Sequence, residues 1–183
     1  METLKRPPKL NPFRRSGWQR RVWDENLVLV RVVKTDTVDL APNAAEWCRL
    51  PYPDHPRGCP AYGKRGDCPP RARRFNSVFL PPFYLVAVRF DLQNHVQRML
   101  AKHKDWTVRQ ARCVLYWQKR VDAQLVAECE KRLRTLPSGF GYTLKPEAMG
   151  VNVITTCLKQ GISIEVKPKH YAWKIAIIGR YTV

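Results

Sequence analysis

Three cysteines, Cys48, Cys59 and Cys68, lie in one proline-rich stretch with the spacing C-x10-C-x8-C. Thiolates hold zinc or an iron–sulfur cluster when the chain places their sulfur atoms around one centre. The spacing differs from the closely paired cysteines of zinc fingers and from the ferredoxin pattern. Proline between the cysteines restricts the backbone and glycine permits tight reversals, so a long loop can still carry the ligands. The stretch therefore predicts a metal site.

A fourth ligand has several candidates elsewhere in the chain. Cys157 is the first choice, because it falls beside Gly150 on the expected helix, away from that helix's apolar stripe. Cys113 also falls off the apolar stripe of its helix, whereas Cys129 lies at a stripe edge and is expected in the core. His55 lies between Cys48 and Cys59 in sequence and could replace one thiolate, as imidazole does in zinc sites.

Two segments resemble a known family. The run C-P-A-Y-G at residues 59–63, followed by C-P-P at 68–70, resembles the C-x2-Y-G…C-P-P motif of a prokaryotic family of unknown function described as predicted metal-binding proteins. The run K-P-E-A-M-G-V-N-V at 145–153 is similar to a later P-S-M-E-A-x-G-I-D-V stretch of that family. The family's further cysteine-rich segment between these blocks is missing, and Cys48 lies further upstream than the family's first cysteine. The resemblance implies a metal or iron–sulfur site and no established activity.

The identity of the metal follows in part from the donor atoms. Soft thiolate ligands suit both zinc and iron–sulfur clusters. The resemblance and the long, irregular spacing favour a [4Fe–4S] cluster, with Zn as the alternative. Three cysteine ligands would leave one iron open to a substrate, while a fourth would give a closed, structural centre.

The charge of the chain predicts a polyanionic partner. The 183 residues contain 33 Lys and Arg against 15 Asp and Glu, a formal net charge of +18. Cations that contact phosphates release condensed counterions, so nucleic acid, RNA or DNA, is the expected partner. An acidic protein partner is the alternative.

Two regions are candidates for phosphate and base contacts. Residues 1–23 form a basic N-terminal arm in which aromatic residues alternate with the candidate contacts Arg14, Arg15, Arg20 and Arg21. A helix over 107–133 carries a second, cationic strip opposite its apolar stripe: Arg109, Arg112, Tyr116, Lys119 and Arg120. A solvated helix face and an arm anchored to the core by its tryptophans are the competing interpretations.

The elements that must position these residues predict an α+β fold with a small mixed β-sheet and helices packed on one face. The domain spans 24–183 and contains a long Pro/Gly-rich cysteine loop at about 41–82. Prolines occur in this loop too often for a helix or a strand to run through it. Apolar patterning predicts strands at 27–33, buried on both faces, and at 84–90, 162–166 and 173–178. Helices are expected from 91 or 94 to about 104, at 107–133, and from 146 to 159 or 160.

Several function classes lack their motifs. The sequence contains no Gly-rich phosphate loop, no G-x-S-x-G and no H-E-x-x-H. The apolar runs are too short for a membrane span, which predicts a cytoplasmic protein with reduced cysteines. We expect a metal-stabilised nucleic-acid-binding protein. Two alternatives stay open: an iron–sulfur enzyme that inserts sulfur into a nucleic-acid base or removes it, and a metal-stapled accessory subunit of a larger complex.

Overall fold

The computed structural model describes residues 28–41, 43–51 and 56–182. The N-terminal arm at 1–23 and His55 lie outside the described residues, so the contacts predicted for Arg14, Arg15, Arg20 and Arg21 stay predictions.

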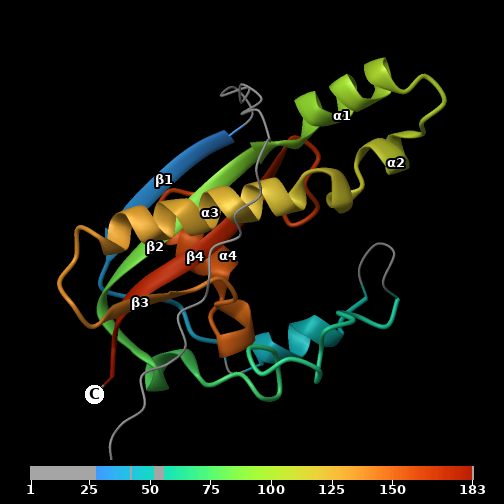
Figure 1. Ribbon diagram of the computed structural model, residues 1–183. Coiled ribbons are helices and arrows are strands. Elements are labelled where there is room, and N and C mark those ends of the chain that lie inside the picture. Colours follow the sequence, from blue (N-terminus) through green and yellow to red (C-terminus); the bar gives the residue numbers. More distant parts are fainter. Residues whose placement is uncertain (1–27, 42, 52–55, 183) are drawn as a thin grey trace, which may run out of the picture.

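The centre of the fold is a four-stranded sheet in the order β1-β2-β4-β3 (Figure 1). The strands are β1 (Val28–Thr35), β2 (Phe79–Asp91), β3 (Phe140–Thr143) and β4 (Tyr171–Tyr181). Together with the helices they confirm the predicted α+β class. The sheet is antiparallel in every pair rather than mixed, because β4 starts opposite the end of β2, where Tyr171 faces Asp91.

Two strand predictions were wrong in detail. β1 is an edge strand with exposed side chains such as Leu29 and Val32, whereas its apolar run predicted burial on both faces. Residues 162–166 form no strand, although Ile162 is buried. β3, which was not predicted, takes the sheet edge beside β4.

The first face of the sheet is covered by α3 (Gln118–Leu133). The three- and four-residue spacing of Val121, Leu125 and Cys129 places these side chains in one core cluster with β2 and β4, as the apolar stripe predicts. Trp117, directly before the helix, stacks on Phe90 at 4.9 Å between ring centroids.

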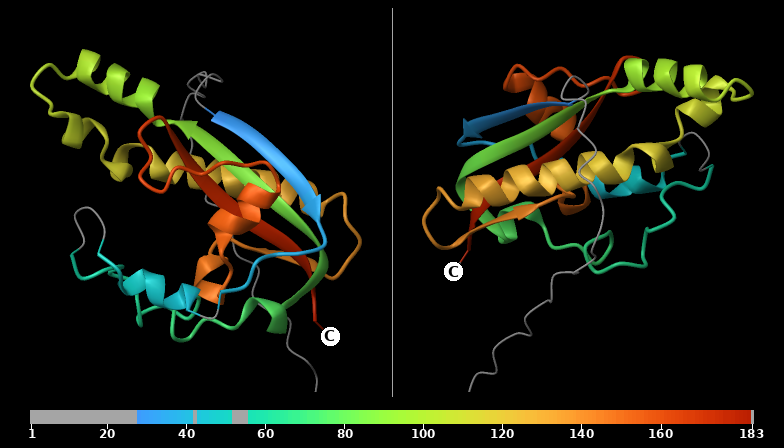
Figure 2. Two further views of the ribbon diagram at one scale, coloured as in Figure 1. Left: turned by 180° about the vertical axis from the view of Figure 1, so that it is seen from behind. Right: turned by 45° about the horizontal axis from the view of Figure 1, so that its top comes forward.

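The second face is also covered, whereas the sequence predicted helices on one face only. A separate core cluster joins the sheet to α4 (Val153–Lys159) and to the 3-10 helix η3 (Phe75–Ser77). Figure 2 shows α4 in front of the strands and α3 behind them in its left view. Each face of the sheet therefore has its own hydrophobic core.

The predicted helix over 107–133 is broken into three pieces. α2 (Val108–Ala111) and the 3-10 helix η4 (Val114–Tyr116) precede α3. The indole Nε1 of Trp117 donates to the carbonyl of Arg112 at 3.3 Å and fixes the turn between them. α1 (Leu92–Lys102) begins as predicted, with the Asp91 carboxylate accepting from the Asn94 backbone N–H. α1 and α2 extend beyond the end of the sheet (Figure 1).

The predicted helix from 146 to 159 or 160 is interrupted at Gly150, which has φ +93°. The 3-10 helix η5 (Glu147–Met149) precedes this glycine and α4 follows it. Residues 39–41 pair with 150–152 through two backbone hydrogen bonds, from Ala41 N to Gly150 O and from Asn152 N to Asp39 O. A continuous helix would have used these groups internally, so the pairing explains the break. Within the described ranges, no helix combines the length and apolar character that a membrane span requires.

Candidate metal centre and nucleic-acid surface

Cys48 lies on the 3-10 helix η2 (Ala44–Arg49), which packs against η5 beneath the second face of the sheet (Figure 1). Ala44 at the start of η2 is completely buried and anchors this end of the cysteine-rich segment, residues 44–69. The proline-rich loop therefore contains regular structure, which its composition did not predict.

The backbones of Cys48 and Cys59 adjoin although ten residues separate them. The Cys59 N–H donates to the Cys48 carbonyl oxygen at 2.6 Å. Gly58 permits this approach, because it has φ +76° and an added Cβ would lie 2.6 Å from the same oxygen. Only glycine fits there without displacing the backbone.

Cys68 is brought back toward Cys59 by a second close pairing. The Tyr62 N–H donates to the Cys59 carbonyl at 3.1 Å, which closes a turn, and the Gly63 N–H donates to the Pro69 carbonyl at 2.8 Å. These bonds fold the chain between the second and third cysteines into a compact reversal.

The three thiols lie within electrostatic reach of one another. Burial raises the pKa of the Cys48 thiol, and charge on the Cys59 and Cys68 thiols raises it further. All three cysteines are free of disulfide bonds. Cys68 is buried and the other two are half-buried, so the thiols are partly protected from solvent.

A charged pair connects this segment to the body of the protein. The Lys145 Nζ atom lies 2.7 Å from an Asp67 carboxylate oxygen and 3.6 Å from the Cys68 sulfur. The hydrogen bond from Lys145 holds the pKa of Asp67 below its usual range. Sequence reasoning missed Lys145, since no local pattern marks a lysine 77 residues away from Cys68.

The residues fit a thiophilic metal in donor type but are not arranged as a formed site. In the part of the chain that the structure describes, no group of three or more His, Cys, Asp or Glu side chains could hold an ion as placed. Cys48, Cys59 and Cys68 would hold the metal or cluster, and soft thiolates are the ligands that zinc and iron–sulfur clusters take. Binding would require the three thiols to close further around the centre.

Cys157, predicted as the fourth ligand, is placed elsewhere. It lies on α4, completely buried in the second core cluster with Val153 and Ile162. Burial and, to a smaller extent, the neighbouring Glu147 raise the pKa of its thiol to about 12. Cys48, Cys59 and Cys68 lie near one another in the cysteine-rich segment, whereas Cys157 is part of a core cluster, and the four predicted ligands form no metal-holding group among the described residues. Cys129 is completely buried in the first core cluster, as expected.

The predicted cationic strip is only partly assembled. Tyr116, Lys119 and Arg120 line one depression of about 340 Å³ at the start of α3, together with Leu115, Trp117 and Ala123. Arg109 is exposed on α2. The Arg112 guanidinium instead donates to the Pro168 carbonyl at 2.6 Å and supports the turn before β4. Three predicted residues thus share a surface, while Arg112 has a structural contact.

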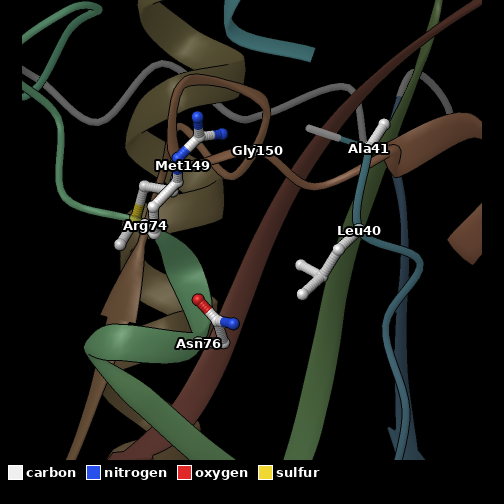
Figure 3. Close-up of a pocket in the computed structure, with 6 residues that line it drawn as sticks. All are labelled: Leu40, Ala41, Arg74, Asn76, Met149 and Gly150. Carbon is white, nitrogen blue, oxygen red and sulfur yellow. The ribbon is translucent and has the colours of Figure 1, made fainter. Parts of the chain in front are cut away.

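Another pocket, which the sequence did not predict, lies where the two ends of the cysteine-rich segment leave the body. Figure 3 shows Leu40 and Ala41 across the opening from Arg74, Asn76 and Met149. Its volume of about 260 Å³ is below that of most small-molecule sites, about 300–1,000 Å³.

No family model matches this chain, and no curated protein or solved structure matches it either. The resemblance of the C-x2-Y-G…C-P-P motif therefore stays an expectation.

Proposed function

We propose that this chain is a cytoplasmic nucleic-acid-binding protein whose cysteine-rich segment holds a metal centre. The observation that carries the metal centre is the backbone pairing that holds Cys48, Cys59 and Cys68 near one another. A 2.6 Å backbone hydrogen bond joins the first two, and the Gly63–Pro69 pairing returns the third to them. Long loops in compact domains are usually functional, so a loop whose backbone is folded to bring three cysteines together favours a function for these cysteines.

The preferred occupant is a [4Fe–4S] cluster, with Zn as the alternative. Both accept thiolate ligands, and the long spacing between the cysteines resembles a cluster wrapped by a loop more than a compact zinc site. The bound group would supply rigidity to the cysteine-rich segment and, for a cluster, a redox-active or Lewis-acidic iron.

Anaerobic purification followed by elemental analysis and visible absorption tests this proposal. Iron with labile sulfide and visible absorption would support the cluster, and stoichiometric zinc would support the alternative. Cys59→Ser should remove the metal, whereas Cys113→Ser, which changes a half-buried cysteine outside the segment, should retain it. Full metal content in Cys59→Ser would contradict the proposal.

Nucleic-acid binding is supported by the depression that Tyr116, Lys119 and Arg120 line and by the net charge of +18. Each phosphate contact should contribute about −0.9 to the slope of log affinity against log salt on duplex DNA. Lys119→Gln should weaken binding and reduce that slope, while Lys131→Gln, an exposed lysine near the other end of α3, should not.

The arm has its own test. Replacing Arg14, Arg15, Arg20 and Arg21 with alanine should weaken binding uniformly across sequences. Binding to nucleic acid without a linear dependence on salt would contradict phosphate contacts and would favour the acidic protein partner of an accessory subunit.

A second candidate function is an iron–sulfur enzyme that inserts sulfur into a nucleic-acid base or removes it. The observation that favours it is the burial of Cys157 in the second core cluster. A centre held by Cys48, Cys59 and Cys68 alone would have one coordination position open to a substrate. Metal retained at full stoichiometry in Cys157→Ala would support three protein ligands. Metal lost from that variant would favour a closed, structural centre.

A further inference from the structure

Three aromatic rings contact one another in a row between α1 and α3, one pair stacked and the other tilted. His103, which caps the end of α1, stacks on Trp106 at 4.1 Å between ring centroids and 12° between planes. Trp106 in turn meets Tyr116 of η4 at 4.9 Å and 35°. The turn that carries these rings is fixed by the capping box of α2, in which Thr107 and Gln110 bond each other reciprocally.

The last of these three rings, Tyr116, borders the depression at the start of α3. Tyr116 is 53% exposed and Leu115 is 83% exposed, so both remain open to a ligand. Lys119 and Arg120 contribute cationic groups to the same depression. An aromatic ring supported from behind, with cations beside it, is the arrangement that single-strand binders use for a base and its phosphates.

We propose that this surface binds single-stranded nucleic acid by stacking an unpaired base on Tyr116, with Lys119 and Arg120 on the adjacent phosphates. The inference rests on the proposed nucleic-acid function and narrows it to single strands. In a duplex both faces of each base are covered by neighbouring bases, so a protein ring reaches a base face only where the strand is unpaired or the base is extruded.

A protein segment is the rival occupant of this surface, since Leu115, Val114 and Val108 are exposed apolar residues. The charge favours nucleic acid. Two of the six residues that line the depression are cationic and none is acidic, and Arg109 is exposed on the adjoining α2.

The test compares short single-stranded RNA and DNA oligonucleotides with the duplex of the same sequence, using the full chain at fixed low salt. The unmodified protein should bind single strands more tightly than the duplex. Tyr116→Ala should weaken single-strand binding about 5- to 150-fold, the loss expected for one stacked base, and should change duplex binding little. Tyr116→Trp should retain affinity, and its added indole emission should be quenched by single strands.

The outcomes separate this inference from the proposed function. Equal affinity for duplex and single strands, or unchanged single-strand affinity in Tyr116→Ala, would overturn stacking while leaving nucleic-acid binding intact. Unchanged single-strand affinity in Tyr116→Ala would also favour a protein segment as the ligand of this surface. Absence of binding to every oligonucleotide would refute the proposed nucleic-acid function itself. Thermal unfolding of each variant establishes that the Tyr116 substitutions leave the fold intact.

Discussion

Replacing Gly58 with alanine tests whether the convergence of the cysteines is what binds the metal, without altering any thiol. Gly58 has φ +76°, and an added Cβ would lie 2.6 Å from the Cys48 carbonyl oxygen and 2.7 Å from two backbone atoms of Arg49. Gly63→Ala is the matched control, because Gly63 has φ +72° but no atom within 4 Å of its added Cβ.

The two variants share one cost and differ in another. A left-handed conformation costs a non-glycine residue roughly 1–2 kcal/mol. Gly58→Ala adds a collision with backbone, and overpacking of this kind costs about 1–3 kcal/mol. The neighbour is a backbone carbonyl rather than the end of a flexible side chain, so the chain itself must move. Metal affinity should therefore fall up to about 100-fold more in Gly58→Ala than in Gly63→Ala.

Cobalt(II) titration of the metal-free protein provides the assay. Sulfur coordination gives cobalt a thiolate charge-transfer absorption, and its rise with added metal reports affinity and stoichiometry. In the metal-free protein the cysteine-rich segment can relax around either alanine without disturbing the two core clusters, to which Gly58 and Gly63 do not belong, so the strain should appear mainly on metal binding. If both variants bind cobalt with the same affinity as the unmodified protein, the Cys48–Cys59 contact is irrelevant to metal binding and the proposed centre is wrong.

Three further predictions concern the cores and their titratable groups. Leu125→Ala should lower the free energy of unfolding by about 2–5 kcal/mol in urea denaturation, because Leu125 is buried between α3 and the sheet, whereas Leu158→Ala, at an exposed position, should cost about 0.5 kcal/mol or less. Burial lowers the pKa of His95, so the unfolded chain binds a proton more readily. Stability should thus fall as pH drops below about 6.5, and His95→Gln should flatten this dependence. The thiols of Cys129 and Cys157, each with its pKa raised to about 12, should resist alkylation in the native protein and react after unfolding; mass spectrometry measures both states, and labelling of either in the native protein would contradict their burial.

Local patterns predicted the elements whose cause is local. The spacing of Val121, Leu125 and Cys129 is sufficient to place α3 on the sheet, and Asp91 is sufficient to start α1. β1 was predicted as a strand but not as an edge. Whether another element covers an apolar strand depends on segments that are distant in the sequence, so the residues of β1 alone could not predict its exposure.

Non-local contacts explain the elements that were missed. Gly150 was a visible interruption in the predicted helix from 146, but its effect depends on pairing with residues 39–41, more than a hundred positions earlier in the chain. The mixed sheet and the single helical layer were wrong for the same reason. The antiparallel direction of the strands and the placement of α3 and α4 on opposite faces are set by contacts between segments that are far apart in the chain.

The candidate sites show the same division. Clustering in one proline-rich segment predicted that Cys48, Cys59 and Cys68 belong together, and wheel position predicted that Tyr116, Lys119 and Arg120 share a face. Arg112 was assigned to that face because a helical wheel cannot show its contact with the Pro168 carbonyl, which lies 56 residues away in the sequence. Cys157 was assigned as a ligand because Ile154 and Leu158 were taken as the buried stripe of this helix, whereas in α4 both are exposed and Cys157 is buried instead.

The cysteine-rich segment meets the body through the η2–η5 packing and the Lys145–Asp67 pair, and Cys48, Cys59 and Cys68 belong to neither hydrophobic cluster. The hydrophobic burial that stabilises the two cores therefore does not depend on these three cysteines. In small zinc-dependent domains, by contrast, the metal's binding free energy is the folding free energy. If the proposed metal centre forms, this architecture would allow the polypeptide to fold first and to receive the metal or cluster afterwards, as a separate step of maturation.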